Sequence, residues 1–146
     1  MGNAKVIVPV KIGDQAVFSK TISESDVYNF GGIIGDFSPM HFNEEHAKHT
    51  PYRHRIAHGV LTFAFASTVS TILQDASALE NPSVSYGYEK VRFINPVYFG
   101  DTLRAIYTVT DIDEAQSKSY GKVEIYNQHE EIVCACTHIL KFFAKS

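Results

Sequence analysis

The stretch that decides the fold is IAHGVLTFAFASTVSTILQ, residues 56–74, which is apolar on nearly every side. Its β-branched and aromatic residues favour a strand locally, but its length decides for a helix of about five turns. A helix that is apolar all round is one surrounded by protein. The stretch is about as long as a membrane span, but His58 and five Ser or Thr residues make it too polar for one. We therefore expect a buried helix and no membrane segment.

The chain that follows this helix, from about residue 83, is strand-like. Long strands with short connections form an antiparallel meander. A buried helix followed by a meander predicts an α+β arrangement, in which an antiparallel sheet wraps around a long central helix. The predicted strands are YEKVRFINPV (88–97), TLRAIYTVTDI (102–112), SYGKVEIYNQ (119–128) and EIVCACTHILKFF (131–143), with turn signals at Gly100-Asp101, Asp113-Glu114 and residues 127–130.

The chain before the central helix contains shorter elements. KVIVPV (5–10) and AVFSKTI (16–22) are short strand candidates. A helix is predicted to begin after Ser23, a fair N-cap, with Asp26 three residues later as a short-armed capping box. The residues at helical spacing along it are Val27, Phe30 and Ile34.

A second, shorter helix is predicted further along, after a turn. Pro39 disfavours helix at Ser38, so the chain must turn there. Asn43 then caps the segment NEEHAKH, which has Glu44 and Glu45 in its first turn, where the helix dipole favours them.

The bulk properties fit one globular domain over residues 1–146 and exclude a nucleic-acid binder. Apolar residues make up 45% and charged residues 20%, and the net charge is −3. A nucleic-acid footprint would be strongly basic. The N-terminus has no signal-peptide pattern. Cys134 and Cys136 would share one face of a strand, too far apart and too parallel for a comfortable disulfide, so we expect reduced thiols in a cytoplasmic protein.

The segment GDFSPMHFN, residues 35–43, is the first candidate for chemistry. Asp36 and His41 lie five residues apart, which puts them on different faces of a continuous helix. They can converge only if the backbone turns, and Pro39 provides that turn. A carboxylate beside an imidazole can hold its tautomer and share in activating one water. From these residues alone, a polar turn with a half-buried histidine fits as well.

The start of the central helix is the second candidate. The first amides of a helix have no intrahelical partner and carry the positive end of the dipole. Gly59 lets a ligand approach the backbone closely, so a carbonyl oxygen that gains negative charge would find a donor there. Tight helix packing is the other explanation for this glycine. Ser67, two turns later, is ambiguous too, since its hydroxyl can simply bond back to the Phe63 carbonyl.

The histidines of this region do not predict a metal site. His46/His49 and His54/His58 have helical ligand spacing. The His-Glu-x-x-His pattern is absent, and both cysteines are remote in sequence. We expect no bound metal.

Two segments together resemble a known family: Gly-Asp-Phe-Ser-Pro-Met-His at 35–41 and Arg-Ile-Ala-His-Gly-Val-Leu at 55–61. They resemble the MaoC-like dehydratases, most closely the (R)-specific enoyl-CoA hydratases, whose motif reads roughly Gly-Asp-x-Asn-Pro-hydrophobic-His with a small residue some six positions later. Ala47 fills that last place. Phe-Ile-Asn-Pro-Val at 93–97 and the following Gly-Asp extend the resemblance to nearly the whole chain. Ser38 departs from it, because the family usually has asparagine there, and this bears on geometry and substrate preference.

The resemblance implies a hot dog fold, which usually pairs through sheet edges, and hence a homodimer or higher homo-oligomer with active sites near the subunit interface. It also implies roles for four residues. Asp36 and His41 would activate a water, the amide of Gly59 would bind the thioester oxygen, and Ser67 would support the network of the site.

The implied reaction is the reversible hydration of trans-2-enoyl-CoA to (3R)-hydroxyacyl-CoA, with acyl-CoA as the binding partner and no metal or redox cofactor. Two alternatives remain open: a dehydratase of another hydroxyacyl thioester, branched or dicarboxylic, and a non-catalytic hot dog protein that binds acyl-CoA. Four cations are candidates for the CoA phosphates, although a solvated side chain is the better explanation for each: Arg53, Arg55, Lys90 and Arg92.

Overall fold

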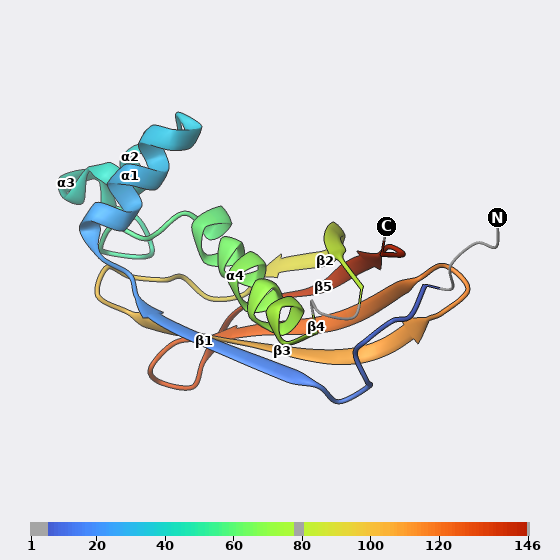
Figure 1. The fold of residues 1–146 in the computed structure, drawn as a ribbon. Coiled ribbons are helices and arrows are strands. Elements are labelled where there is room, and N and C mark those ends of the chain that lie inside the picture. The colour runs from blue at the N-terminus through green and yellow to red at the C-terminus, as the bar shows by residue number, and fades with distance from the viewer. Residues whose placement is uncertain (1–5, 78–80, 146) are drawn as a thin grey trace.

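One antiparallel sheet with one long helix lying across it forms the frame of the molecule (Figure 1). The computed structural model describes residues 6–77 and 81–145. The strands are β1 (Gln15–Thr21), β2 (Ser83–Phe93), β3 (Thr102–Asp113), β4 (Lys118–Tyr126) and β5 (Ile132–Phe142), in the sheet order β1-β3-β4-β5-β2. The helices are α1 (Glu24–Ile34), α2 (Pro39–Phe42), α3 (Glu44–Ala47) and α4 (Gly59–Ser77). The predicted α+β hot dog arrangement is confirmed.

The predicted four-strand meander is only partly right. β3, β4 and β5 are consecutive neighbours, but β2 pairs with β5 and forms an edge of the sheet. β1 occupies the other side of β3, with Gln15 opposite Thr108. The chain therefore crosses from β2 at one edge to β3 near the other. β2 also ends at Phe93 rather than at residue 97, because Pro96 cannot donate to a ladder.

The N-terminal predictions had mixed outcomes. Residues 6–10 form no strand, which the presence of Pro9 helps to explain, and Lys5 lies outside the described residues. The second candidate is confirmed as β1, close to its predicted bounds. The Ser23 capping box is also confirmed: the Ser23 side chain accepts from the Asp26 amide, and the Asp26 carboxylate accepts from the Ser23 amide.

The central helix begins later than predicted and is less enclosed. The chain at Ile56 and Ala57 is still extended, since Ile56 bridges to Tyr98 and the Ala57 amide donates to the Val97 carbonyl. α4 packs against all five strands, yet one side of it stays open. Val60 is 51% exposed and Ile72 is 40% exposed. The expectation of a helix surrounded on all sides is therefore wrong for a single chain.

The two cysteines fit the prediction of reduced thiols. Both lie on β5, buried and unpaired with each other. Burial raises the pKa of the Cys134 thiol to about 11 and that of Cys136 to about 12. Among the helices of the described ranges, none has the length and hydropathy that crossing a bilayer demands.

Candidate active site

Asp36 is positioned by the end of α1. Gly35 ends this helix in the left-handed region, with φ 76°, and its amide donates to the Gly31 carbonyl. The backbone conformation that glycine tolerates there turns the chain out of the helix just before Asp36. The Asp36 carboxylate then accepts from the Ser38 amide at 3.1 Å. Its side chain stays 48% exposed, so one oxygen remains free for a ligand or water.

His41 is positioned by α2, whose first residue is Pro39. The His41 amide donates to the Ser38 carbonyl. The ring Nδ1 lies 2.6 Å from the Ile56 carbonyl oxygen. Because a carbonyl only accepts, Nδ1 carries the proton and Nε2 keeps its lone pair. Burial is the main cause that lowers the pKa of His41 below its ordinary value, so this nitrogen is available as a base at neutral pH.

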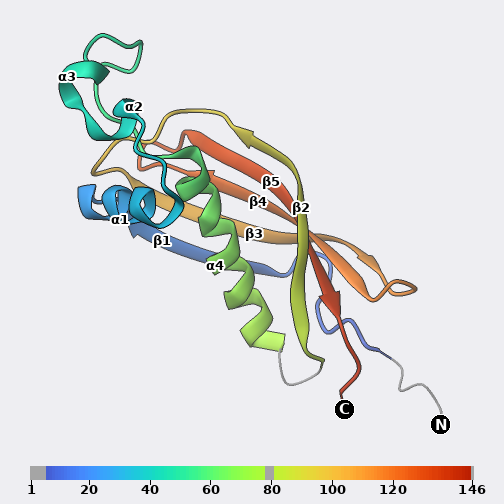
Figure 2. The ribbon, with the colours of Figure 1, turned by 90° about the horizontal axis from the view of Figure 1, so that it is seen from above.

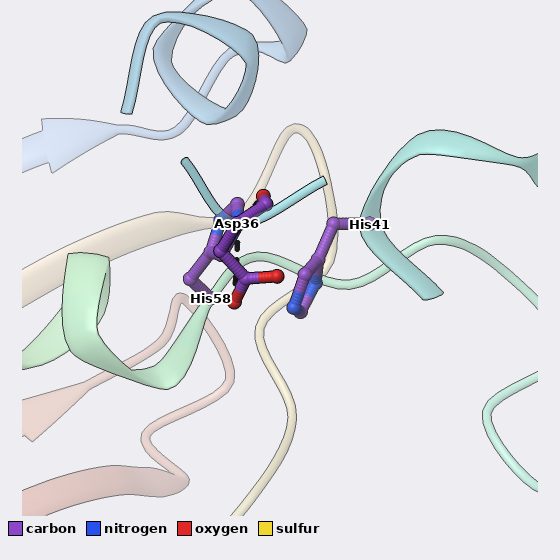
Figure 3. A group of neighbouring side chains, drawn as sticks. All are labelled: Asp36, His41 and His58. Carbon is purple, nitrogen blue, oxygen red and sulfur yellow. Dashed lines mark hydrogen bonds and ion pairs between the residues drawn. The ribbon is translucent and has the colours of Figure 1, made fainter. Parts of the chain in front are cut away.

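The turn at Pro39 brings the two candidates together, as predicted. One carboxylate oxygen of Asp36 and one nitrogen each of His41 and His58 all lie within 4.8 Å of one another. Figure 3 shows the Asp36 carboxylate directed toward the His41 ring. The arrangement is a carboxylate and a neutral imidazole that converge on one small space, which is what water activation needs.

His58 is a third member of this cluster, and from the sequence it was considered only as part of a His54/His58 metal-ligand pair and of the family motif. It is 2% exposed, and its ring lies against the His41 ring with centroids 3.9 Å apart. Its Nε2 is 3.0 Å from the Asp36 backbone oxygen and 3.9 Å from the carboxylate. The available signal was a histidine at the start of a strongly apolar helix, where a buried polar ring needs a partner.

Gly59 begins α4, next to His58, and a cavity opens beside it. In the described part of the chain no acceptor bonds the Gly59 amide, as expected for the first residue of a helix. The cavity has a volume of about 360 Å³. The Phe93 ring forms part of its wall and lies so close to Gly59 that a Cβ there would be 3.0 Å from ring atoms. Ile56, whose carbonyl holds His41, lines the same cavity, so cavity and cluster are adjacent.

Ser67 is not brought to this cluster within one chain. It lies eight residues beyond Gly59, about 12 Å further along the helix axis, and its side chain is exposed. Its predicted role in the site stays a prediction. Ser38, the departure from the family motif, is half-buried and gives its amide to Asp36. Its hydroxyl makes no cap bond to the first turn of α2.

The cluster of Asp36, His41 and His58 is also the candidate for a metal ion among the described residues. The His58 Nε2 proton is committed to a backbone carbonyl, so this nitrogen has no free lone pair. The Nδ1 of His58 keeps its lone pair but is buried, with no hydrogen-bond partner among the described residues. Asp36 and His41 are the two other members that can offer a ligand atom, whereas a catalytic zinc usually has three protein ligands.

The four candidate cations for CoA phosphates differ in their surroundings. Arg55 is held by Glu24 at 2.7 Å and lies 3.4 Å from Glu44, with its guanidinium over the Phe99 ring. These contacts join α1 to the loop before α4, so the Arg55 guanidinium already has partners within the protein. The other three side chains are exposed, and the two arginines among them donate to backbone carbonyls: Arg53, Lys90 and Arg92.

The fold and the site together point to the class of protein to which this chain belongs. A family model described as MaoC like domain matches residues 8–132. The chain belongs to the MaoC-like dehydratase family, and as a member of it the chain is a hydro-lyase.

Individual relatives indicate which enzymes of this family the chain is similar to. The chain is 41% identical over 103 residues to an (R)-specific enoyl-CoA hydratase of Rhodospirillum rubrum, an alignment that covers 70% of this chain and 68% of the relative. It is 34% identical to a 3-hydroxybutyryl-CoA dehydratase of Methylorubrum extorquens, over 70% of this chain and 62% of the relative. The solved (R)-hydratase of A. caviae, involved in PHA biosynthesis, superposes with a TM-score of 0.78 at 26% identity, over 90% of this chain and 96% of that one.

Proposed function

We propose that this chain catalyses the reversible hydration of a trans-2-enoyl-CoA to the (3R)-hydroxyacyl-CoA. The observation that carries the proposal is the geometry of His41. The Nδ1 proton of His41 is donated to the Ile56 carbonyl, so Nε2 keeps its lone pair and can act as a base. The His41 ring and the Asp36 carboxylate lie beside the same small space. Similarity to an (R)-specific enoyl-CoA hydratase supports the same reaction.

The thioester oxygen would bind at the Gly59 amide, at the positive end of α4. As the water oxygen bonds to C3, electrons move through the conjugated system onto the thioester oxygen. Removing one donor from such a site typically costs about 2.7–4 kcal/mol of barrier. His41 and Asp36 would take the water proton and return it to C2 as the enolate collapses to the thioester carbonyl, so atoms and charge balance.

We propose that the reaction needs no metal or redox cofactor, because conjugation with the thioester already stabilises the charge that develops. The test uses the purified wild-type chain with crotonyl-CoA, followed by the loss of absorbance of the conjugated thioester. We expect saturable hydration, a (3R) product by chiral analysis, and an unchanged rate after treatment with EDTA. Saturable binding of crotonyl-CoA without turnover would instead support a non-catalytic acyl-CoA binder, and loss of activity with EDTA would contradict the cofactor proposal.

A second thioester carrier can be tested in the same assay. One relative, at 25% identity, is a 3-hydroxyacyl-[acyl-carrier-protein] dehydratase of Arabidopsis thaliana. We propose CoA as the carrier because the more similar relatives have CoA in their names. Comparing kcat/KM for crotonyl groups on CoA and on acyl carrier protein, and then over a panel of chain lengths and branched acyl groups, would define the substrate.

We also propose that two copies of this chain form a homodimer through β2 and α4. β2 is an eleven-residue edge strand, and the backbone groups of such an edge are a template for pairing with another strand. Val84 and Tyr86 are exposed on it. α4 packs against β2, and the two elements lie side by side (Figure 2). As far as Ile72, the exposed residues of α4 are small or apolar, and the charged Asp75 follows them one turn later. The small or apolar residues form the exposed stripe of α4: Val60, Ala64, Ser67, Thr68, Thr71 and Ile72. The buried reduced thiols fit a reducing compartment such as the cytoplasm.

The dimer makes a defined prediction. Light scattering on a sizing column should give about twice the chain mass of 16.3 kDa. Ile72→Arg, in the exposed stripe, should shift the protein to the monomer because it puts a charge where apolar surface would be buried. Ile33→Arg is the matched control, since Ile33 is 81% exposed and belongs to α1 rather than to β2 or the exposed stripe of α4. A monomeric wild type at micromolar concentration would contradict the proposal.

A further inference from the structure

We infer that His58 is a positioning residue, which fixes Asp36 and His41 relative to each other and to the Gly59 amide. The inference rests on the proposed hydratase function and names a residue that this function does not yet include. It starts from the contacts of one short segment, residues 56–58, directly before α4.

This segment holds both members of the proposed acid–base pair. The Ile56 carbonyl accepts the Nδ1 proton of His41 at 2.6 Å. Two residues later, His58 donates from Nε2 to the backbone oxygen of Asp36 at 3.0 Å. The carbonyl of His58 also accepts from the Thr62 amide in the first turn of α4. One rigid junction therefore links the carboxylate, the imidazole and the helix start that would bind the thioester oxygen.

The surroundings of His58 restrict its ring to one orientation. The ring is 2% exposed and lies against His41 on one side, with its plane tilted by 31°. Phe30 and Phe42 contact it edge-on, with centroids at 5.3 and 6.2 Å. Figure 3 shows the His58 ring beside Asp36, with their interaction marked by a dashed line. A ring held in this way can keep the Asp36 backbone in place during a catalytic cycle.

The same contacts exclude His58 as a second base. Its Nε2 proton is used by the Asp36 carbonyl, so that nitrogen has no lone pair to accept a proton. Its Nδ1 is buried and has no hydrogen-bond partner among the residues that the structure describes. His58 therefore acts through Asp36 and His41 rather than on the substrate.

The experiment compares two replacements for His58 that are similar in size and shape but differ in whether they carry a hydrogen-bond donor. His58→Gln places an amide donor at about the reach of Nε2, whereas His58→Met fills similar space without a donor. We expect His58→Met to lower kcat for crotonyl-CoA by about 10- to 100-fold with KM nearly unchanged, because a small displacement of the reacting groups suffices for that loss. His58→Gln should recover most of the rate. Binding of butyryl-CoA, which cannot be hydrated, should be equal in all three proteins.

The outcomes separate this inference from the proposed function. An inactive wild type would overturn the hydratase proposal itself. An active wild type with equal kcat in the Met and Gln variants would overturn the role of His58 alone. If His58→Met does not fold, nitrogen NMR of the imidazoles in the wild type decides instead. We expect the Nε2–H tautomer for His58 and the Nδ1–H tautomer for His41, and the opposite tautomer at His58 would refute the inference.

Discussion

Replacing Asp36 by asparagine should lower kcat for crotonyl-CoA hydration by about 10²- to 10⁴-fold, the range that a positioned acid–base group contributes. Asparagine can still accept the bond from the Ser38 amide, so the turn is preserved and only the charge and basicity are lost. His41→Ala should cause a loss of the same order. Steady-state kinetics with crotonyl-CoA would measure the loss of kcat in both variants. KM should change little, because the proposed contact that binds the thioester is made by the Gly59 amide rather than by Asp36 or His41.

The pH dependence gives an independent check on His41. Its pKa is lowered by burial, so the base is fully available at neutral pH and is lost only as the pH falls below its ordinary value of 6.5. The acid limb of kcat/KM should therefore lie below pH 6.5. His54→Ala is the control, because His54 is exposed and paired with Glu44 outside the cluster.

Near-normal kcat in either Asp36→Asn or His41→Ala would end the assignment of these two roles.

The sequence predicted the local features of the site better than its assembly. Ser23 and Asn43 were identified as caps because a cap depends only on residues three positions apart. The approach of Asp36 to His41 was foreseeable because Pro39 forces a turn between them. The contact from His58 to the Asp36 carbonyl spans 22 residues and depends on how α1 lies against the segment before α4, where Phe30 contacts the His58 ring. No local pattern encodes such a contact.

The topology of the sheet was also beyond local reasoning. The strand composition of β2 is as clear as that of β3, but strand periodicity does not say which neighbour a strand takes. β2 pairs with β5, which is some fifty residues away, and β3 takes β1 instead. The exposed stripe of α4 was missed for a related reason. Small and apolar residues look the same in sequence whether they face a core or another subunit.

The second large effect concerns a buried layer under α4. Tyr107 is fully buried, and its ring lies directly over Gly121 of the neighbouring strand. Its hydroxyl bonds His138 Nδ1 at 3.1 Å. Burial lowers the pKa of His138 to about 4, so the ring stays neutral and can accept this bond. Ser85 contacts the other ring nitrogen at 2.8 Å, which fixes the histidine from the edge strand.

Gly121→Ala should therefore destabilise the fold by about 3 kcal/mol, at the upper end of what overpacking of a core usually costs. A Cβ at Gly121 would lie 1.9 Å from the Tyr107 ring, and the ring cannot move without breaking its bond to His138. Urea unfolding followed by circular dichroism would measure the loss, and the thermal midpoint should fall by about 10 °C. Gly32→Ala is the matched control, because a Cβ there meets nothing within 4 Å, and it should be neutral or slightly stabilising.

A double substitution tests whether the clash is the cause. Tyr107→Val removes the ring that the new methyl group would strike, so Gly121→Ala should be tolerated far better in that background than in the wild type. The double variant should then lose less stability than the two single variants added together, by an interaction free energy of about 1–3 kcal/mol. Strict additivity would show that Gly121 is needed for its backbone and not for the space above it. Tyr107 and His138 belong to the face of the sheet that α4 covers. A non-additive result would therefore identify the contact between Tyr107 and Gly121 as part of the packing that sets the orientation of α4.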